Sequence, residues 1–407
     1  MYGLLGRKLG HSLSPQIHSL LGGYSYKLFC REPEELDGFF ADSTIEGFNV
    51  TIPYKVTAMK YCADVTGTAK KTGCVNTVVR RSDGSLFGDN TDYYGFCRMA
   101  EKYGADFENK KVLVLGNGGA SGTVRTVAAD RGAAEVVTIS RRGENNYENI
   151  GRHFDADIIV NATPFGMYPD NGGRLIDLQS FKNCGCVLDL IYNPCRTGLI
   201  MDAERLGIPC GNGLFMLVAQ ALRSAERFLD KKLDDSVMET VYKKILCAQK
   251  NIVLIGMPGC GKSTVGAGLA ELTGRPFIDT DAEIVKKEGR PIPEIFSADG
   301  EEYFRIAEFA AVAEAGKKTG VIISTGGGAV MREENREALS QNGTVIYLKR
   351  DVASLARDGR PLSADGEAVE KLYRQRKKIY ETFASFSIEV DNDIDATVRE
   401  VMKCISL

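Results

Sequence analysis

Two glycine-rich loops are the residues of this sequence whose types and spacing point most directly to chemistry. One, GMPGCGKS, begins at Gly256 and fits the pattern GxxxxGKS; the other, GNGGAS, begins at Gly116. Each follows a short apolar run, NIVLI or KVLVL, and precedes a helical pattern. Glycine lets the backbone approach a phosphate closely, and a helix N-terminus supplies N–H donors. The sequence therefore predicts two phosphate-binding strand–turn–helix units.

The GxxxxGKS loop has a residue for each task in holding the phosphates of ATP. Its backbone N–H groups cradle the phosphates, Lys262 neutralises the β- and γ-phosphate charge, and Ser263 ligates Mg²⁺. The complete motif between a strand and a helix disfavours the alternative of a plain turn. The predicted ATP-binding residues are Gly256, Gly259, Cys260, Gly261, Lys262, Ser263 and Thr264.

The GNGGAS loop has the glycines of a dinucleotide site, with Ser121 where a third glycine usually stands. After the next apolar run come Arg141 and Arg142, and no acid that would bind the ribose of NAD. Two guanidinium groups fit the 2′-phosphate of NADP, whereas two solvated arginines are the alternative. The predicted NADP-binding residues are Gly116, Gly118, Gly119, Ala120, Ser121, Ser140, Arg141 and Arg142.

Alternating strands and helices must position the first loop. We predict strands at Lys111–Leu115, Glu135–Ile139, Asp157–Asn161 and Val187–Asp189, which indicates a parallel, doubly wound sheet. A further strand is expected at Met1–Leu5. The helical run Met216–Phe228 is expected to return to the N-terminal part, and Ala225–Gln249, without Gly or Pro, to end one domain and continue as a helical connector.

Length and composition limit the class of protein. A chain of 407 residues is long enough for two or three domains. A net charge of −3 argues against a broad nucleic-acid surface, and no apolar run reaches the length of a membrane span. Eleven cysteines without a CxxC pair and three histidines disfavour a zinc site. We expect a cytoplasmic enzyme without membrane or nucleic-acid partners, with self-association left open.

Residues 1–245 resemble shikimate dehydrogenases through a series of motifs in the order of that family. They include HSLSP (11–15), GFNVTIPYK (47–55), GCVNTV (73–78), GDNTD (88–92), NATPFGM (161–167), DLIYNP (189–194) and MLVAQ (216–220). The resemblance implies NADPH-dependent reduction of 3-dehydroshikimate to shikimate. It also implies an α/β substrate domain, 1–93 with 214–245, around a Rossmann-like NADP domain, 94–213.

The resemblance implies roles for residues around this substrate. Lys55 and Asp92 match the catalytic pair, in which the lysine delivers a proton to the ketone oxygen while hydride reaches the carbon. Burial lowers a lysine pKa and a nearby carboxylate raises it, so a lysine tuned toward neutral pH and an oriented donor both stay open. The matched substrate-binding residues are Ser12, Ser14, Thr51, Asn76, Asp92, Tyr192 and Gln220, and Gly213 matches a position near the nicotinamide.

Three features depart from the dehydrogenase pattern. Tyr93 follows the catalytic aspartate where the family usually has glycine, and GNGLFM differs around Gly213. The stretch between Ser14 and Asn49 is shorter than usual. We expect these departures to affect rate and cofactor preference rather than the type of reaction.

Residues 251–407, after a linker at 246–250, resemble shikimate kinases. Beside the GKS loop, the matching segments are FIDTD (277–281), FRIAE (304–308), STGGGA (324–329), RPL (360–362) and RQRKKIY (374–380). The resemblance implies a P-loop domain with a parallel sheet, like that of nucleoside monophosphate kinases. It also implies phosphorylation of the shikimate 3-hydroxyl by MgATP.

The kinase resemblance implies a second set of roles. Asp279 is implied to bind the metal ion together with Ser263, and Asp281 to contact the attacking hydroxyl of the substrate. Arg305 and Arg376 match the clamp on the substrate carboxylate, with Arg374 and Lys377 as alternatives to Arg376. Gly327 approaches the substrate ring. Lys262 and the lid residue Arg360 act on the transferred phosphoryl group.

Together the two resemblances imply a bifunctional enzyme of aromatic amino-acid biosynthesis, with shikimate diffusing between its sites. One alternative is a kinase joined to a dehydrogenase half that is weak or prefers quinate and NAD. Another is a ligand-sensing regulator without catalysis. The intact Lys55, Asp92, Lys262 and Asp281 argue against the regulator.

Overall fold

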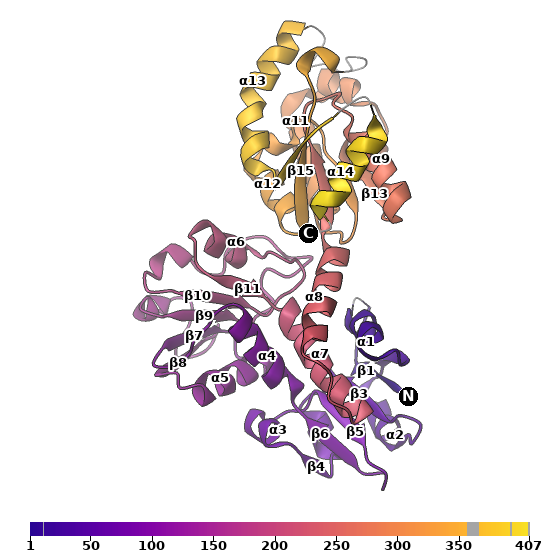
Figure 1. Cartoon of the computed structure of the whole chain (residues 1–407). Helices are drawn as coiled ribbons and strands as arrows, with labels where there is room; N and C mark the ends of the chain where they lie inside the picture. The colour runs from indigo at the N-terminus through magenta and orange to yellow at the C-terminus, as the bar shows by residue number, and fades with distance from the viewer. Residues whose placement is uncertain (11, 356–365, 391–392, 406–407) are drawn as a thin grey trace. The chain divides into compact units, whose positions relative to one another are not determined.

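The computed structural model describes residues 1–10, 12–355, 366–390 and 393–405. The chain divides into two compact units, Met1–Ile245 and Leu246–Leu407 (Figure 1). Within the described residues, no helix is long and apolar enough to span a bilayer. Short 3₁₀ turns lie at Pro33–Glu35, Thr57–Tyr61, Ile150–His153, Leu178–Ser180, Ala329–Met331 and Val352–Ser354.

The first unit begins with a mixed sheet of six strands in the order β2-β1-β3-β5-β6-β4. Its strands are β1 (Tyr2–Gly6), β2 (Tyr26–Cys30), β3 (Gly47–Val50), β4 (Asp64–Val65), β5 (Thr77–Arg80) and β6 (Leu86–Asp89). The helices α1 (Ser14–Gly22), α2 (Leu36–Ala41) and α3 (Gly67–Thr72) accompany it. The aromatic side chains of Phe39, Phe40 and Phe48 pack edge-to-face in its core.

The second sheet of this unit is wholly parallel, in the order β11-β10-β9-β7-β8. It comprises β7 (Lys111–Leu115), β8 (Glu135–Ile139), β9 (Ile158–Asn161), β10 (Cys186–Asp189) and β11 (Cys210–Asn212), with α5 (Gly119–Asp130) and α6 (Gly198–Arg205). Val112 and Val114 face one core, and Leu113 and Leu115 face another, as expected for a strand covered on both sides. The predicted strands are confirmed to within one residue.

Two helices, α4 (Thr91–Lys102) and α7 (Leu214–Leu229), pack against each other between the two sheets (Figure 1). They approach closely at Gly95, where a Cβ atom would lie 2.7 Å from the carbonyl oxygen of Met216. The stretch predicted as helical from Ala225 is two helices. Asp230 adopts a left-handed conformation with φ of 44°, and α8 (Ser236–Gln249) begins after it.

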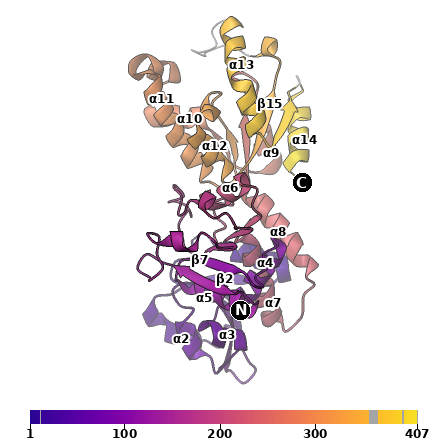
Figure 2. The ribbon, with the colours of Figure 1, turned by 90° about the vertical axis from the view of Figure 1, so that its left-hand side faces the viewer.

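The second unit is a parallel sheet in the order β13-β14-β12-β15-β16. Its strands are β12 (Asn251–Ile255), β13 (Phe277–Asp279), β14 (Ile322–Ser324), β15 (Gly343–Lys349) and β16 (Phe386–Glu389). Its helices are α9 (Lys262–Thr273), α10 (Thr280–Glu288), α11 (Ile292–Gly316), α12 (Glu333–Ser340), α13 (Gly366–Phe383) and α14 (Ile394–Ile405). Helices α9 and α14 lie on one face, and α11, α12 and α13 on the other (Figure 2).

This topology gathers three of the motifs of the second unit at one edge of the sheet. The carboxyl ends of β12, β13 and β14 lie side by side, because these parallel strands are neighbours. The GKS loop follows β12, Asp279 ends β13 and Asp281 comes just after it, and the run Gly326–Gly328 (the GGG run) follows β14. A ligand in an open parallel sheet binds at this edge.

Candidate active sites

The Lys55 and Asp92 side chains form an ion pair, with 2.6 Å between Nζ and Oδ2. Asp92 lies in the first turn of α4, and Lys55 lies in the loop after β3. Burial lowers the pKa of Lys55, but the charge of Asp92 and its hydrogen bond outweigh burial and leave the pKa raised. The ammonium form therefore persists at neutral pH. Of the two roles left open by the sequence, this geometry favours the oriented donor.

A buried polar network fixes the start of α4 beneath this pair. Asn76 accepts hydrogen bonds through Oδ1 from the Thr91 backbone N–H at 2.7 Å and from the Thr91 hydroxyl at 3.1 Å. Ser224 lies 3.0 Å from the same hydroxyl. Asn49 donates to Ser224 at 2.7 Å and to Thr77 at 2.9 Å. The network joins β3, β5, α4 and α7, so it couples both helices to the first sheet.

Asn49, Thr91 and Ser224 are members of this network that the sequence did not single out as site residues. Asn49 and Thr91 lie inside the motifs GFNVTIPYK and GDNTD, which was the signal that the sequence offered. The structure adds that these polar side chains are buried and therefore need hydrogen-bond partners. Asp189, in DLIYNP, is similar: its carboxylate is fully buried and accepts from Thr197 at 2.6 Å and Asn161 at 3.0 Å. Burial raises the pKa of Asp189 to about 6.

The remaining predicted substrate residues have varied surroundings. Gln220, in α7, donates to the Leu217 carbonyl at 2.9 Å and accepts from the Thr91 hydroxyl at 3.4 Å. Its amide thus finds partners inside the protein. Ser14 starts α1 and donates its backbone N–H to the Ser12 hydroxyl at 3.2 Å. Thr51 is half-buried beside β1, and burial raises the pKa of Tyr192.

The GNGGAS loop leaves open space at the start of α5. Gly116 has a φ of 101°, a conformation that suits glycine. A Cβ atom at Gly118 or Gly119 would meet no atom within 4 Å, so the backbone there is accessible to a phosphate. Ala120 is half-buried. Ser121 is fully buried and its hydroxyl has no partner among the described residues, so its side chain is inside the fold.

The other predicted cofactor residues lie at the ends of β8 and β11. Arg141 and Arg142 are exposed directly after β8, and neither forms an ion pair with a described residue. Ser140 donates its backbone N–H to the Asn145 carbonyl. At Gly213 a Cβ atom would lie 2.1 Å from the Leu190 carbonyl oxygen. Glycine at 213 is therefore required by packing, whatever its role toward the nicotinamide.

Tyr93 is directed toward the far end of α5. Its hydroxyl donates to Asp130 at 2.9 Å, and Lys71 pairs with the same carboxylate at 2.8 Å. Asp130 is the last residue of α5, and the glycine loop is at the other end of that helix. The departure at Tyr93 therefore ties α3, α4 and α5 together.

In the second unit, the GKS loop has the backbone that a phosphate cradle needs. Gly256, Gly259 and Gly261 have φ values of 147°, 84° and 101°. Lys262 is buried, and its Nζ donates to the carbonyl oxygens of Gly256 and Met257, each at 3.0 Å. Cys260 is fully buried, which agrees with a small residue filling space in the loop, and Thr264 is exposed.

Ser263 and Asp279 bring together two oxygen ligands of the kind that Mg²⁺ prefers. The Ser263 hydroxyl donates to Asp279 Oδ2 at 2.6 Å. Asp279 also caps α10, accepting through Oδ1 from the backbone N–H groups of Asp281 at 3.0 Å and Ala282 at 3.3 Å. A hydroxyl and one carboxylate, completed by waters and phosphate oxygens, fit this ion.

Asp281 is half-buried next to the GGG run, and its carboxylate forms no ion pair with a described residue, although the charges of Lys262 and Arg305 act on it. Its Oδ1 atom has no hydrogen bond among the described residues, and a Cβ atom at Gly326 would lie 2.6 Å from it. Burial, with the adjacent charge of Asp279, raises the pKa of Asp281 to about 6. An unpaired carboxylate with this pKa is suited to accept a proton from a hydroxyl near neutral pH.

Arg305 and Arg376 surround a buried glutamate, Glu308. Arg305 donates to Glu308 at 2.9 Å through one terminal nitrogen and to Glu301 at 2.9 Å through the other. Glu308 is only 1% exposed; burial raises its pKa, and the charges of Arg305 and Arg376 oppose this rise. A Cβ atom at Gly328 would lie 2.7 Å from Arg305, so the GGG run is shaped around the guanidinium.

The three basic candidates in RQRKKIY are separated by their burial. Arg376 is 6% exposed, whereas the Arg374 side chain is 77% exposed and pairs with Glu370. Lys377 lies over the Tyr373 ring. Tyr380, from the same helix, donates its hydroxyl to the Gly327 carbonyl. Arg376 is thus the one of the three that lies near Glu308, while Arg360 lies outside the described residues.

Arg332 is a further arginine near this clamp that the sequence did not single out. Its guanidinium donates to the Arg305 carbonyl oxygen at 3.4 Å, and its charge acts on Glu308. It follows the GGG run by a few residues, and no spacing in the sequence distinguished it from a surface arginine.

Comparison with known proteins identifies relatives for both units. Residues 4–78 match the model of the shikimate dehydrogenase substrate binding domain, and residues 258–406 match that of shikimate kinase. An NADP(+) shikimate dehydrogenase of Clostridium perfringens is 33% identical over 269 residues, which cover 61% of this chain and 98% of that protein.

Solved structures give the same result for the first unit. A chorismate mutase/shikimate 5-dehydrogenase fusion protein from Clostridium acetobutylicum is 35% identical, with a TM-score of 0.57, and the match covers 60% of this chain and 96% of that one. A quinate dehydrogenase from Corynebacterium glutamicum, in complex with NAD, is 25% identical with a TM-score of 0.55 over 60% of this chain and 98% of its own.

Proposed function

The chain belongs to the shikimate dehydrogenase family over its first unit, and we propose that it is an enzyme with two consecutive activities. The first is NADPH-dependent reduction of 3-dehydroshikimate to shikimate. The second, in the unit that matches shikimate kinase, is phosphorylation of the shikimate 3-hydroxyl with MgATP. The observation that carries this proposal is the presence in one chain of the Lys55–Asp92 pair and of the Ser263–Asp279 pair beside a GKS loop.

In the reduction, bound NADPH supplies hydride to the ketone carbon. The Lys55 ammonium donates a proton to the ketone oxygen, which becomes the hydroxyl of shikimate. Asp92 holds Nζ at 2.6 Å and keeps the ammonium charged. Asn76, whose Oδ1 is occupied by Thr91, directs its Nδ2 donors to a substrate hydroxyl. Ser12, Ser14 and Tyr192 bind the carboxylate, and Thr51 and Gln220 the ring hydroxyls.

In the phosphorylation, bound MgATP supplies the phosphoryl group. Asp281 accepts the proton of the shikimate 3-hydroxyl as that oxygen bonds to phosphorus and the bond to ADP breaks. Arg305 and Arg376 hold the substrate carboxylate, since a guanidinium matches a carboxylate bidentately. Gly327 allows the ring to approach the backbone. Lys262 and Arg360 neutralise the phosphoryl charge, and Ser263 and Asp279 hold the ion.

Further assignments go with this proposal. The substrate domain comprises 1–93 and 214–245, the NADP domain 94–213, and the kinase domain 251–407. A cytoplasmic location and the lack of nucleic-acid and membrane partners are expected from the composition. Quinate with NAD is the second candidate for the first unit, because a quinate dehydrogenase with NAD is among its structural neighbours.

The experiment that tests the two activities separates them by substitution. Lys55→Ala should abolish NADPH oxidation with 3-dehydroshikimate and leave ADP release from shikimate intact. Lys262→Ala should have the opposite effect. Loss of both activities in either variant would contradict two independent sites. A titration with NADP⁺ and NAD⁺, using shikimate and quinate in the reverse direction, decides between the two candidates for the first unit.

A further inference from the structure

A cavity of about 630 Å³ lies on the side of α4 that carries Tyr94, Arg98 and Glu101. It is also lined by Thr66, at the start of α3, and by Asp89, at the end of β6. Arg131 at the end of α5 and Arg223 and Arg227 of α7 complete its charged lining. Its volume is within the range of small-molecule sites. The lining also includes Thr91, which bonds Asn76, and Tyr93, but none of the arginines has a role in the two proposed reactions.

Four arginines, Arg98, Arg131, Arg223 and Arg227, line this cavity, which we call the arginine cavity. Only two carboxylates, Asp89 and Glu101, line it with them. An adjoining cavity of about 380 Å³ shares Arg223 and Arg227, and is also lined by Arg81, Lys231 and Lys232 and by the acidic Glu226 and Asp230.

The carboxylates around the arginine cavity use only part of its donors. Glu101 accepts from Arg131 at 2.6 Å and from Arg98 at 3.0 Å, so two guanidinium groups share one carboxylate. Arg227 engages Asp89 through Nε at 2.8 Å. Asp235 lies 3.7 Å from Arg98. Arg98 Nε is buried and has no hydrogen-bond partner among the described residues.

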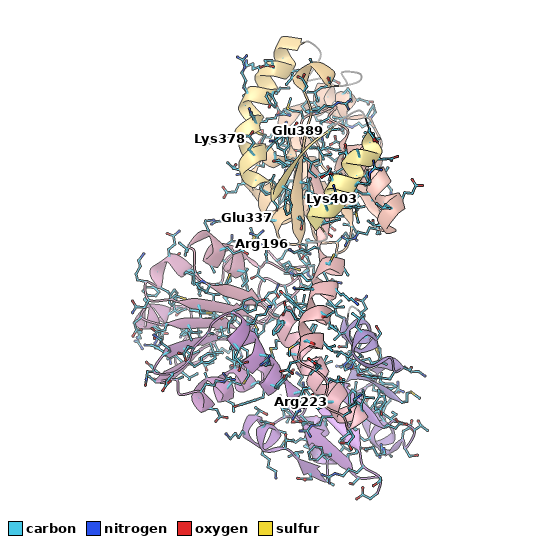
Figure 3. All side chains as sticks on the ribbon, in the orientation of Figure 1. Arg196, Arg223, Glu337, Lys378, Glu389 and Lys403 are labelled. Atoms are coloured by element: carbon cyan, nitrogen blue, oxygen red, sulfur yellow. The ribbon has the colours of Figure 1, made fainter. Side chains whose placement is uncertain are left out.

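Arg223 has one ion pair, to a residue of its own helix. It pairs through one terminal nitrogen with Glu226 on the same helix, at 2.7 Å, and its guanidinium lies 6.0 Å from the centre of the Tyr94 ring. Figure 3 labels this side chain on α7. Tyr94 gives the cavity an aromatic wall, which suits an organic ligand that carries its anionic groups at one end.

We propose that the arginine cavity binds a small organic or inorganic anion with at least two negative groups, of the phosphoryl or polycarboxylate class. Guanidinium groups recognise both classes through paired N–H donors. Such an anion would take over donors of Arg98, Arg131 and Arg223, and would add a second acceptor where Glu101 now serves two arginines.

Occupation of the arginine cavity acts on the dehydrogenase reaction through α4 and α7. Arg98 is on the helix that carries Asp92, and Arg223 lies one turn after Gln220. Arg131 follows α5, which packs on the second sheet, whereas Arg223 is on α7, which contacts β3 and β5 of the first. An anion held by arginines on both sides restricts the movement of one sheet relative to the other. The effect on the reduction rate, which is the kinetic part of the proposal, rests on the proposed function. The binding of the anion, which is the binding part, does not.

The binding part is tested by calorimetry on the full chain with saturating NADP⁺ and ADP, so that both nucleotide sites are filled. Pyrophosphate and tricarballylate are titrated separately. We expect one site, weakened about tenfold or more by Arg223→Gln and by Arg131→Gln, and unchanged by Arg152→Gln, an exposed arginine outside the cavity. The anion that binds more tightly identifies the class. Absence of binding by both anions, or equal affinity in all variants, would overturn the proposal.

The kinetic part is tested by initial rates of NADPH oxidation at saturating NADPH, without ATP or Mg²⁺. We expect the tighter anion to change kcat or the KM for 3-dehydroshikimate at least twofold in the wild type and not in Arg223→Gln. In a parallel series with NADPH varied, an effect of the anion confined to the KM for NADPH would show competition at the cofactor loop and overturn this part. Arg223-dependent binding in a chain that does not reduce 3-dehydroshikimate would instead refute the proposed function and leave the site in place.

Discussion

Burial acts on Lys55 and Asp281 in the same physical way, but neighbouring charges give the two residues different outcomes. Both side chains lose water, which disfavours the charged form. Lys55 has a carboxylate at 2.6 Å, so its pKa is raised and the ammonium persists. Asp281 has a like charge, Asp279, beside it, so its pKa rises to about 6. The ammonium of Lys55 is thereby suited to donate a proton and the carboxylate of Asp281 to accept one.

Asp92→Asn should lower the pKa of Lys55, because burial would then act without an opposing carboxylate. In the wild type, Lys55 stays protonated through neutral and mildly alkaline pH, and its ionisation should not affect the reduction rate there. In Asp92→Asn we expect a rate about a hundredfold lower that also falls as the pH rises through the lowered pKa. The pH profile of kcat/KM checks this. Asp83→Asn, an exposed carboxylate in the same unit, should leave the profile unchanged.

Asp281→Asn should abolish phosphoryl transfer and stabilise the second unit. In the wild type, kinase kcat/KM should fall as the pH drops through about 6, where the carboxylate becomes protonated. Because this folded-state pKa lies above the unfolded value, the charged group destabilises the fold at neutral pH, and that cost disappears as the pH approaches 4.

The stability change is measured by chemical denaturation. Asn at 281 should add on the order of 2 kcal/mol at about pH 7.5 and about a third of that at about pH 4.5. Asp395→Asn, an exposed aspartate in the first turn of α14, serves as the control. Equal effects of Asp281→Asn at both pH values would show that the carboxylate is not destabilised by burial.

For individual residues, the sequence could predict which residue types occupy the motif positions but not the direction in which their side chains point. Arg376 could be distinguished from Arg374 only by its burial. Ser121 follows the glycines of its loop, yet its hydroxyl lies inside the fold. The choice in both cases depends on the rotation of a helix about its axis, which tertiary packing sets and a local motif does not.

Two helices, α4 and α7, carry candidate site residues of the first unit and pack against each other between its sheets. Asp92 and Gln220 belong to them, and their close approach depends on Gly95. A methyl group there would lie 2.7 Å from a backbone carbonyl and 3.0 Å from Gln220 Cβ. The positions of both functional side chains therefore depend on one glycine.

Gly95→Ala should destabilise the first unit by about 1–3 kcal/mol, since the added methyl forces the helices apart. The dehydrogenase rate should fall with it, while the kinase rate stays unchanged. Gly38→Ala in α2 is the matched control, because its Cβ would meet no atom within 4 Å. That substitution should be neutral or slightly stabilising. Denaturation curves and both assays measure the outcome, and a stable, fully active Gly95→Ala would refute the role of this contact.

The elements themselves were largely predictable, because strands that are apolar on both faces and followed by glycine turns leave few alternatives. The strands from Lys111 to Asp189 agree with prediction to within one residue. The break after Leu229 was not predictable, because Asp230 takes a left-handed conformation without a glycine or proline to indicate it. The contact at Gly95 is between distant segments and had no local sign.

As a whole molecule, the chain has separate hydrophobic cores in its two units. Each nucleotide should therefore stabilise one unit only. In a calorimetric scan, we expect NADP⁺ to raise the midpoint temperature of one unfolding transition and MgADP to raise that of the other. At a hundred times Kd, each should contribute about 2.7 kcal/mol. Lys262→Ala should remove the MgADP shift alone, and a single transition that responds equally to both ligands would contradict independent units.

The central claim is that one chain makes shikimate and then phosphorylates it. The most direct measurement supplies the purified chain with 3-dehydroshikimate, NADPH, ATP and Mg²⁺, and follows NADPH loss and ADP release together. The account predicts that ADP release begins after a lag, requires NADPH, and approaches one ADP for each NADPH consumed. ADP release only when shikimate itself is added would contradict it, because the first unit would then not produce the substrate of the second.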